Sequence, residues 1–131
     1  MRTEEIQSEK KGSDLRERTK QFALRIIRLY SALPKSTESQ LLGKQLLRSG
    51  TSVGAHYREA YRSRSDAEYI AKIEGGLQEL EEAVYWMELL CDAEIVKPES
   101  LTELLDEAQQ LAAILVTCSK SAKNRSNKRR A

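Results

Sequence analysis

Apolar residues recur at steps of three and four through most of this chain, and this periodicity limits the possible folds more than any other feature. The clearest stretch lies between residues 66 and 94. Only six glycines and two prolines occur among the 131 residues, so little interrupts long helices. The chain is therefore expected to be all-α. The apolar positions of that stretch share one helical face: Ile70, Ile73, Leu77, Leu80, Val84, Met87 and Cys91.

Local signals divide the pattern into four helices. Pro34 ends the first helix, and Ser36 or the residue after it begins the second. Ser65 and Glu68 match a capping box at the start of the third helix, and Pro98 suits the first turn of the fourth. Short connections make consecutive helices antiparallel, which predicts an up-down-up-down four-helix bundle over residues 13–119. The predicted helices span about 14–32, 37–63, 66–94 and 98–119.

Both ends of the chain differ in composition from the bundle. Residues 1–12 balance their acids and bases and end at Gly12, which predicts a flexible leader. Residues 120–131 contain cations, serines and asparagines with almost nothing apolar, which predicts a basic disordered tail. Such a tail attracts nucleic acid through phosphate charge, or it serves only to keep the protein in solution. Its cations are Lys120, Lys123, Arg125, Lys128, Arg129 and Arg130.

The third predicted helix is apolar over a wider face than one core needs. A second stripe, from Tyr69 to Leu90 at seven-residue spacing, adjoins the first. A bundle helix buries about three positions in seven, so the extra width indicates either a broad core within one protomer or a contact between subunits. We favour self-association. The candidate interface residues are Tyr57, Tyr61, Tyr69, Gly76, Ala83, Tyr85, Trp86 and Leu90.

Charge is sorted between helices. The third helix carries nine acids against Lys72, whereas the second presents cations along one face. The cations could pair with acidic helices across a subunit contact, which is the interpretation that we favour, or face a polyanion at the small residues Thr51 and Ala55. The candidate nucleic-acid-binding residues are Lys44, Arg48, Arg58, Arg62 and Arg64, together with the six cations of residues 120–131.

Nothing in the sequence favours catalysis. His56 is the only histidine, and a lone helical histidine is usually a packing residue. Cys91 and Cys118 occupy apolar stripes, which predicts buried thiols. No phosphate loop, dinucleotide-binding glycine pattern or Glu-x-x-His pair occurs. We therefore expect no enzymatic activity, metal or cofactor. No apolar run approaches the ~18 residues of a membrane span, so no membrane partner is expected either.

The segment from Arg48 to Leu90 resembles a known family. The residues that carry the resemblance are Arg58-Glu59-Ala60, the Arg62-Ser63-Arg64-Ser65 junction and the ELEEA-x-x-W-x-x-LL ending. They are similar to the four-helix-bundle proteins encoded in 23S rRNA intervening sequences and to the related accessory variability proteins of diversity-generating retroelements. The resemblance covers roughly residues 14–119. It implies a bacterial cytoplasmic protein, a ring-shaped homopentamer and no enzymatic activity.

The residues and the resemblance together predict a non-enzymatic, self-assembling bundle with salt-sensitive, low-specificity binding to RNA or DNA. The retroelement branch of the resemblance implies a nucleic-acid-binding partner of a reverse transcriptase. The alternative is a protein-interaction scaffold, for example a reverse-transcriptase accessory subunit, with no direct nucleic-acid role. A third possibility, a small-molecule site in the bundle or the ring pore, needs a polar pocket that the sequence does not locate.

Overall fold

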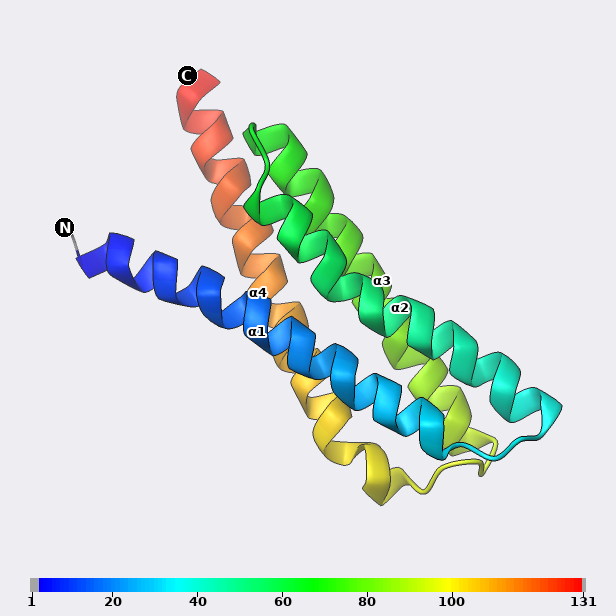
Figure 1. Ribbon diagram of the computed structural model, residues 1–131. Helices are drawn as coiled ribbons and strands as arrows, with labels where there is room; N and C mark the ends of the chain where they lie inside the picture. The colour runs from blue at the N-terminus through cyan, green and yellow to red at the C-terminus, as the bar shows by residue number, and fades with distance from the viewer. Residues whose placement is uncertain (1–2, 131) are drawn as a thin grey trace.

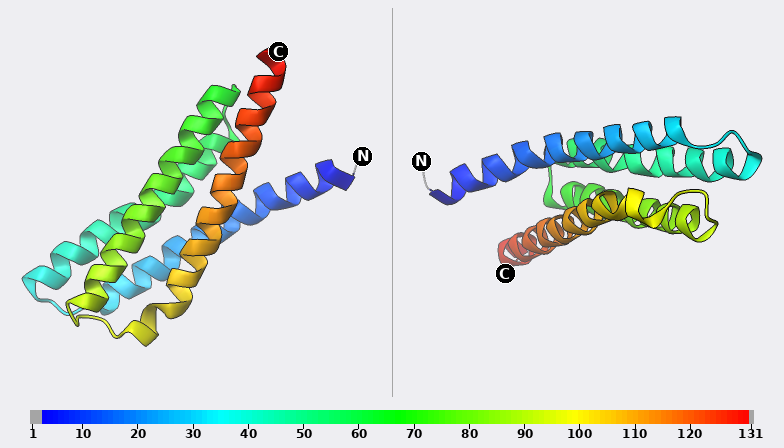
Figure 2. Two further views of the ribbon diagram at one scale, coloured as in Figure 1. Left: turned by 180° about the vertical axis from the view of Figure 1, so that it is seen from behind. Right: turned by 90° about the horizontal axis from the view of Figure 1, so that it is seen from below.

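The computed structural model describes the backbone of residues 3–130 and the side chains of residues 15–130. It contains four helices, α1 (Thr3–Ala32), α2 (Thr37–Tyr61), α3 (Asp66–Asp92) and α4 (Pro98–Arg130). Consecutive helices run antiparallel, and the pair α1 and α2 packs over the pair α3 and α4 (Figures 1 and 2). The predicted all-α, up-down-up-down four-helix bundle is confirmed.

The second and third helices, α2 and α3, begin at the predicted caps. The Ser36 hydroxyl accepts a hydrogen bond from the Ser39 amide at 3.4 Å, and the Ser65 hydroxyl accepts one from the Glu68 amide at 3.1 Å. The Glu68 carboxylate accepts from the Arg64 amide at 3.3 Å, one residue before the donor of a standard capping box. Helices α2 and α3 both end two residues before their predicted ends.

The turn between α3 and α4 contains a residue in a strained conformation. Glu94 has a φ of 59°, in the left-handed region that glycine usually occupies after a helix. The amides of Ile95 and Val96 donate to the Leu90 carbonyl at 3.0 and 3.1 Å and close the helix end. Holding a residue with a Cβ in this region costs about 1 kcal/mol. The turn therefore closes α3 with some loss of stability.

The first and last helices, α1 and α4, are longer than predicted. Helix α1 begins at Thr3 rather than near residue 14. The leader predicted over residues 1–12 is therefore helical from Thr3, while residues 1 and 2 lie outside the described residues. Its first turns extend past the other helices (Figures 1 and 2).

The disordered tail predicted over residues 120–131 is wrong for the part that the structure describes. Helix α4 does not end near Ser119 but continues to Arg130, and Ala131 lies outside the described residues. Ala122 is fully buried, so this segment packs on the bundle. Ion pairs with α3 stabilise its helical conformation.

The core is built from all four helices, with close contact between α1 and α2 at two glycines. A Cβ on Gly50 would lie 2.9 Å from Ile26 Cγ1, and one on Gly54 would lie 3.1 Å from Thr19 Oγ1. The missing side chains at these two positions therefore let α1 and α2 pack closely. Helices α1 and α4 make the fewest contacts of the neighbouring pairs. The largest fully buried side chains include Phe22, Ile26, Leu46, Ile73, Leu80, Met87, Leu90, Leu101, Leu111 and Leu115.

Candidate nucleic-acid interface

Cations from separate parts of the sequence meet at one end of the bundle. Helices α2 and α4 run in the same direction, so the end of α4 lies beside the loop between α2 and α3 (Figures 1 and 2). We call this region the basic end. It contains all the predicted nucleic-acid-binding residues except Lys44 and Arg48, which lie farther back along α2. Its cations are Arg58, Arg62, Arg64, Lys120, Lys123, Arg125, Lys128, Arg129 and Arg130.

Asp66, the first residue of α3, ties the end of α4 to the bundle. Its Oδ2 accepts a hydrogen bond from Arg129 Nη1 at 2.7 Å, and its Oδ1 lies 3.6 Å from Arg125 Nη2. The aspartate is also well placed at the positive N-terminus of α3. These contacts join residues that are far apart in the sequence, so neighbouring residues give no sign of them. They explain why a segment rich in serine and asparagine stays helical.

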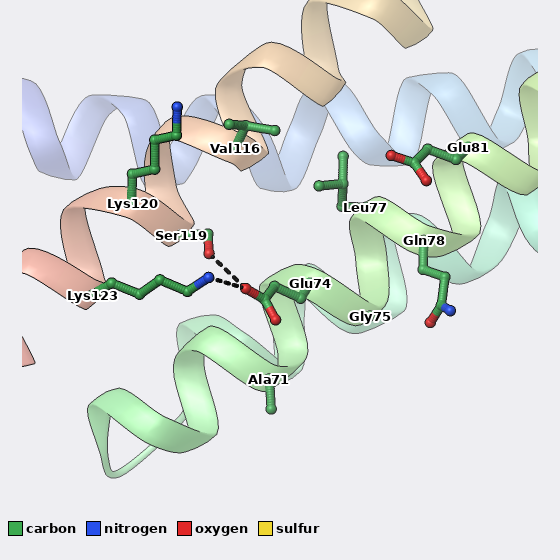
Figure 3. A pocket seen from close by; sticks show the side chains of 10 residues that line it. All are labelled: Ala71, Glu74, Gly75, Leu77, Gln78, Glu81, Val116, Ser119, Lys120 and Lys123. Carbon is green, nitrogen blue, oxygen red and sulfur yellow. Dashed lines mark hydrogen bonds and ion pairs between the residues drawn. The ribbon is translucent and has the colours of Figure 1, made fainter.

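About two helical turns closer to the centre, Glu74 makes a second tie between α3 and α4. Its Oε1 lies 2.6 Å from Lys123 Nζ and accepts a hydrogen bond from the Ser119 hydroxyl at 3.1 Å (Figure 3). The hydrogen bond from Lys123 and then that from Ser119 lower the pKa of the Glu74 carboxyl. The charged carboxylate is therefore the form that the fold favours.

A groove of about 710 Å³ runs between α3 and α4 beside this pair (Figure 3). Leu77 and Val116 form its apolar part, between the acids of α3 and the lysines of α4. Because both signs of charge line it, the groove does not favour an anion over a cation. In the part of the chain that the structure describes, no three His, Cys, Asp or Glu side chains gather in a way that could hold a metal, and no helix there is long and apolar enough to cross a membrane.

Most cations of the basic end remain without an acidic partner. Lys123, Arg125 and Arg129 form the ion pairs described above. The others are exposed and form no ion pair with any described residue. The basic end thus presents more positive charge than the neighbouring acids neutralise. These unpaired cations are Arg58, Arg62, Arg64, Lys120, Lys128 and Arg130.

Arg48 does not belong to this set. Its Nη1 lies 3.2 Å from Glu79 and its Nη2 lies 2.7 Å from Glu82, both on α3 of the same chain. The hydrogen bond to Glu82 and the charge of Glu79 raise the pKa of Arg48. The interpretation that the basic stripe pairs with acids across a subunit contact is wrong for this residue, because the acids that it needs are on the adjacent helix. Lys44, one turn earlier, is exposed.

The sequence also matches a known protein family over most of its length. The model described as 23S rRNA-intervening sequence protein matches residues 11–117. The chain belongs to the 23S rRNA-intervening sequence protein family. A crystal structure of a protein with unknown function from the S23 ribosomal protein family of Bacteroides thetaiotaomicron is 34% identical, with a TM-score of 0.79. The match covers 84% of this chain and 98% of that one. No curated protein matches the chain.

In this member of the 23S rRNA-intervening sequence family, part of the predicted subunit interface is internal. Gly76, Ala83 and Leu90 are buried within the chain. A Cβ on Gly76 would lie 3.3 Å from the Cβ of His56 on α2. Helix α3 contacts both α2 and α4, so it needs two apolar stripes to complete its own protomer. The interpretation of this second stripe as an unsatisfied surface is therefore wrong for these residues.

Two further predicted interface tyrosines also face inward. Tyr57 is only 5% exposed, and burial raises the pKa of its hydroxyl to about 12. Burial, followed by the neighbouring Cys118, raises the pKa of Tyr69 as well. Both hydroxyls therefore stay neutral at physiological pH. Cys118 is a half-buried free thiol, as is Cys91, whose pKa is raised chiefly by burial; the prediction of fully buried thiols was too strong.

The remaining predicted interface aromatics reach the surface. Tyr61 is 51% exposed and Tyr85 is 53% exposed. Trp86 is half-buried, with its ring centroid 5.2 Å from that of Tyr85. Tyr61 lies in the basic end, where the guanidinium of Arg16 sits 4.3 Å from its ring centroid. Arg16 was not among the predicted site residues, although the antiparallel order of α1 and α2 places the early part of α1 beside the last turn of α2.

Proposed function

We propose that this family member is a non-enzymatic protein that binds RNA or DNA through its basic end. One observation carries the proposal. Cations from α2, from the α2–α3 loop and from α4 converge on a single end of the bundle, and several have no acidic partner among the described residues. Clustered cations of this kind release counterions when they meet phosphates, which drives association.

The same geometry supports weak sequence preference. The unpaired cations are exposed arginines and lysines, and such side chains contact phosphates more often than base edges. If these unpaired cations each meet one phosphate, the logarithm of the association constant should fall with the logarithm of salt concentration with a slope of about −4 to −5. Affinity should therefore depend steeply on salt and only weakly on sequence.

The test is a fluorescence anisotropy titration of labelled oligonucleotides, beginning at about 50 mM salt. The double reversal Arg62→Glu with Arg64→Glu removes cations of the basic end. The matched control, Lys35→Glu with Lys97→Glu, changes the same number of exposed charges at the opposite end. We expect the first pair to weaken binding about 30-fold or more and the control to change it less than about 3-fold. Absence of wild-type binding, or equal losses in both variants, contradicts the proposal.

Self-association is the second part of the proposed function, with the homopentamer implied by the family resemblance as its form and the cytoplasm as its location. Leu41 is 61% exposed and Tyr85 is 53% exposed. The Trp86 Nε1 is buried without a hydrogen-bond partner in the part of the chain described. The pairing of Arg48 with Glu82 sets the register of α2 against α3, which places Leu41 about one helical turn along the bundle from Tyr85. A second copy would cover them.

Sedimentation velocity tests this part. Wild-type protein should sediment as an oligomer at micromolar concentration, and Leu41→Glu with Tyr85→Glu should shift it toward the 14.9 kDa protomer. A wild-type protein that sediments only as the protomer contradicts self-association. The alternative of a protein-interaction scaffold, such as a reverse-transcriptase accessory subunit, is favoured if the wild type assembles but binds no nucleic acid and contacts a defined protein after nuclease treatment.

A further inference from the structure

Tyr61 places a large flat ring on the surface of the basic end. It is the last residue of α2, and its side chain is 51% exposed. The guanidinium of Arg16, from α1, lies 4.3 Å from the ring centroid and covers part of it. About half of the residue nevertheless stays exposed to solvent. An exposed tyrosine that is already stacked on one side offers a prepared surface for a second planar group.

Arg16 is itself incompletely satisfied in this arrangement. Its Nε is buried and has no hydrogen-bond partner among the described residues, and no ion pair holds its guanidinium there. Arginine planes stack on nucleic-acid bases as well as on tyrosine. The guanidinium of Arg16 is held over the Tyr61 ring by stacking and not by a carboxylate. A nucleic-acid base can add to this stack as a third planar group.

The charges around the Tyr61 ring indicate which kind of planar group it binds. Arg58 lies one turn before Tyr61 on α2, Arg62 follows it directly, and Arg64 lies in the adjoining loop. All three are exposed and form no ion pair with a described residue. An aromatic ring with cations on its flanks is the arrangement by which proteins bind unpaired nucleotides, with bases on the ring and phosphates on the cations.

We infer that the basic end binds single-stranded nucleic acid in preference to duplex, with an unpaired base stacked on Tyr61 and the flanking phosphates on Arg58, Arg62 and Arg64. The inference rests on the proposed nucleic-acid binding and specifies its substrate class. In a duplex the faces of the bases are already stacked on each other, so the ring of Tyr61 has no base to receive and only the phosphate contacts remain.

Tyr85 provides a matched control within the same chain. It is 53% exposed, close to the value for Tyr61, and also rests against another planar group, Trp86. Its neighbours on α3 are acids, Glu81, Glu82 and Glu88, which repel phosphates. If exposed tyrosine alone were enough, both rings would bind nucleotides; if the cations are also needed, only Tyr61 will.

The experiment compares Tyr61→Ala, Tyr61→Leu, Tyr61→Phe and Tyr85→Ala in the full chain. Each is titrated with a single strand and with a duplex of about 20 nucleotides. Tyr61→Ala and Tyr61→Leu should weaken single-strand binding about 10-fold and leave duplex binding within about 2-fold. Tyr61→Phe keeps the ring and should bind as the wild type does. Tyr85 also belongs to the proposed self-association surface, so any loss that Tyr85→Ala causes should be the same for the single strand and the duplex. The leucine variant retains apolar packing, so it separates loss of stacking from loss of fold.

A fluorescent base analogue in the single strand gives a second measurement. Stacking on Tyr61 should change its emission with the wild type and with Tyr61→Phe, but not with Tyr61→Leu. The inference is overturned if the wild type binds the single strand and the duplex with equal affinity, or if Tyr61→Leu weakens binding to the two equally. In either case the proposed function stands. If the wild type binds neither the single strand nor the duplex, the proposed function itself is overturned.

Discussion

The two ends of the bundle handle charge in different ways. At the basic end, Asp66 and Glu74 draw three cations of α4 onto α3, and the remaining cations face solvent. At the opposite end, residues 88–103, which we call the acidic end, carry five acids against Lys97. No residue in that range forms an ion pair with another described residue.

In this fold, ion pairs therefore stabilise a helix at one end, whereas the charges of residues 88–103 at the other end form no ion pairs with described residues. The last turns of α4 have weak helical composition, yet long-range pairs with α3 hold them in place. The acidic end has Pro98 at the favourable first position of α4, but its turn keeps Glu94 in a left-handed conformation. Four sets of substitutions test how the two ends differ.

The largest effect should follow from removing the cations of α4. Replacing the six Lys and Arg residues between 120 and 130 by Gln retains the buried Ala122 but removes both the positive charge of this segment and its ion pairs with α3. Anisotropy titration at about 50 mM salt should show an affinity loss of about 100-fold or more and a shallower salt slope. The matched change at the acidic end, Glu88, Glu99 and Glu103 to Gln, should not weaken binding. A comparable loss there would mean that the two ends are equivalent.

The next effect concerns the residue that anchors α4. In Asp66→Ala, Arg129 and Arg125 lose their acidic partner, so amide hydrogen exchange over residues 123–130 should become about 10-fold faster. Affinity for nucleic acid should rise about 3-fold, because two cations are released to meet phosphates. Glu81→Gln is the control, since Glu81 forms no ion pair with a described residue. Unchanged exchange in Asp66→Ala would show that these pairs do not hold the helix.

A smaller effect is expected at the acidic end. Glu94→Gly should raise the free energy of unfolding by about 0.5–1 kcal/mol, because glycine adopts the positive φ without strain. Glu94→Ala removes the same charge but keeps the Cβ, so it should give no such gain. Urea denaturation of both variants separates backbone strain from charge. Equal stabilisation by both substitutions would assign the effect to charge repulsion instead.

The smallest effect is the pH dependence of an exposed pair near the basic end. Glu59 lies 2.7 Å from Lys72, whose hydrogen bond and charge lower the pKa of the carboxyl below its ordinary 4.5. The pair therefore stabilises the fold above that value and loses its effect as pH falls through the lowered pKa. Because solvent screens the pair, Lys72→Met should lower the melting temperature by only about 1 °C near neutral pH. At about pH 2 the difference should disappear, and its persistence there would point to lost packing.

The sequence predicted those parts of the fold that depend on local signals. Caps at Ser36 and Ser65 act over three residues, so both helix starts could be read from neighbours in the chain. The helical end of α4 could not, because Arg129 and Asp66 are 63 positions apart. Local composition at that end favoured disorder, and the long-range ion pairs reversed it.

The candidate site was only partly predictable for a related reason. Periodicity identified Gly76, Ala83 and Leu90 as sharing a face, but it carries no information on whether the neighbour is α2 or another subunit. The basic end, by contrast, follows from topology: in an up-down-up-down bundle α2 and α4 point the same way, so their cationic ends must meet. The stacking of Arg16 on Tyr61 depends on the register between α1 and α2, which no periodicity specifies.

The uneven placement of charge along the bundle also affects how the protein meets a partner. Backbone dipoles of antiparallel helices largely cancel, so the side chains determine the electric moment of the whole molecule. With a positive tip and a negative tip, the protein should rotate in the field of an approaching polyanion before the two touch. Productive encounters would then begin tip-first, at rates that fall as added salt shortens the reach of that field.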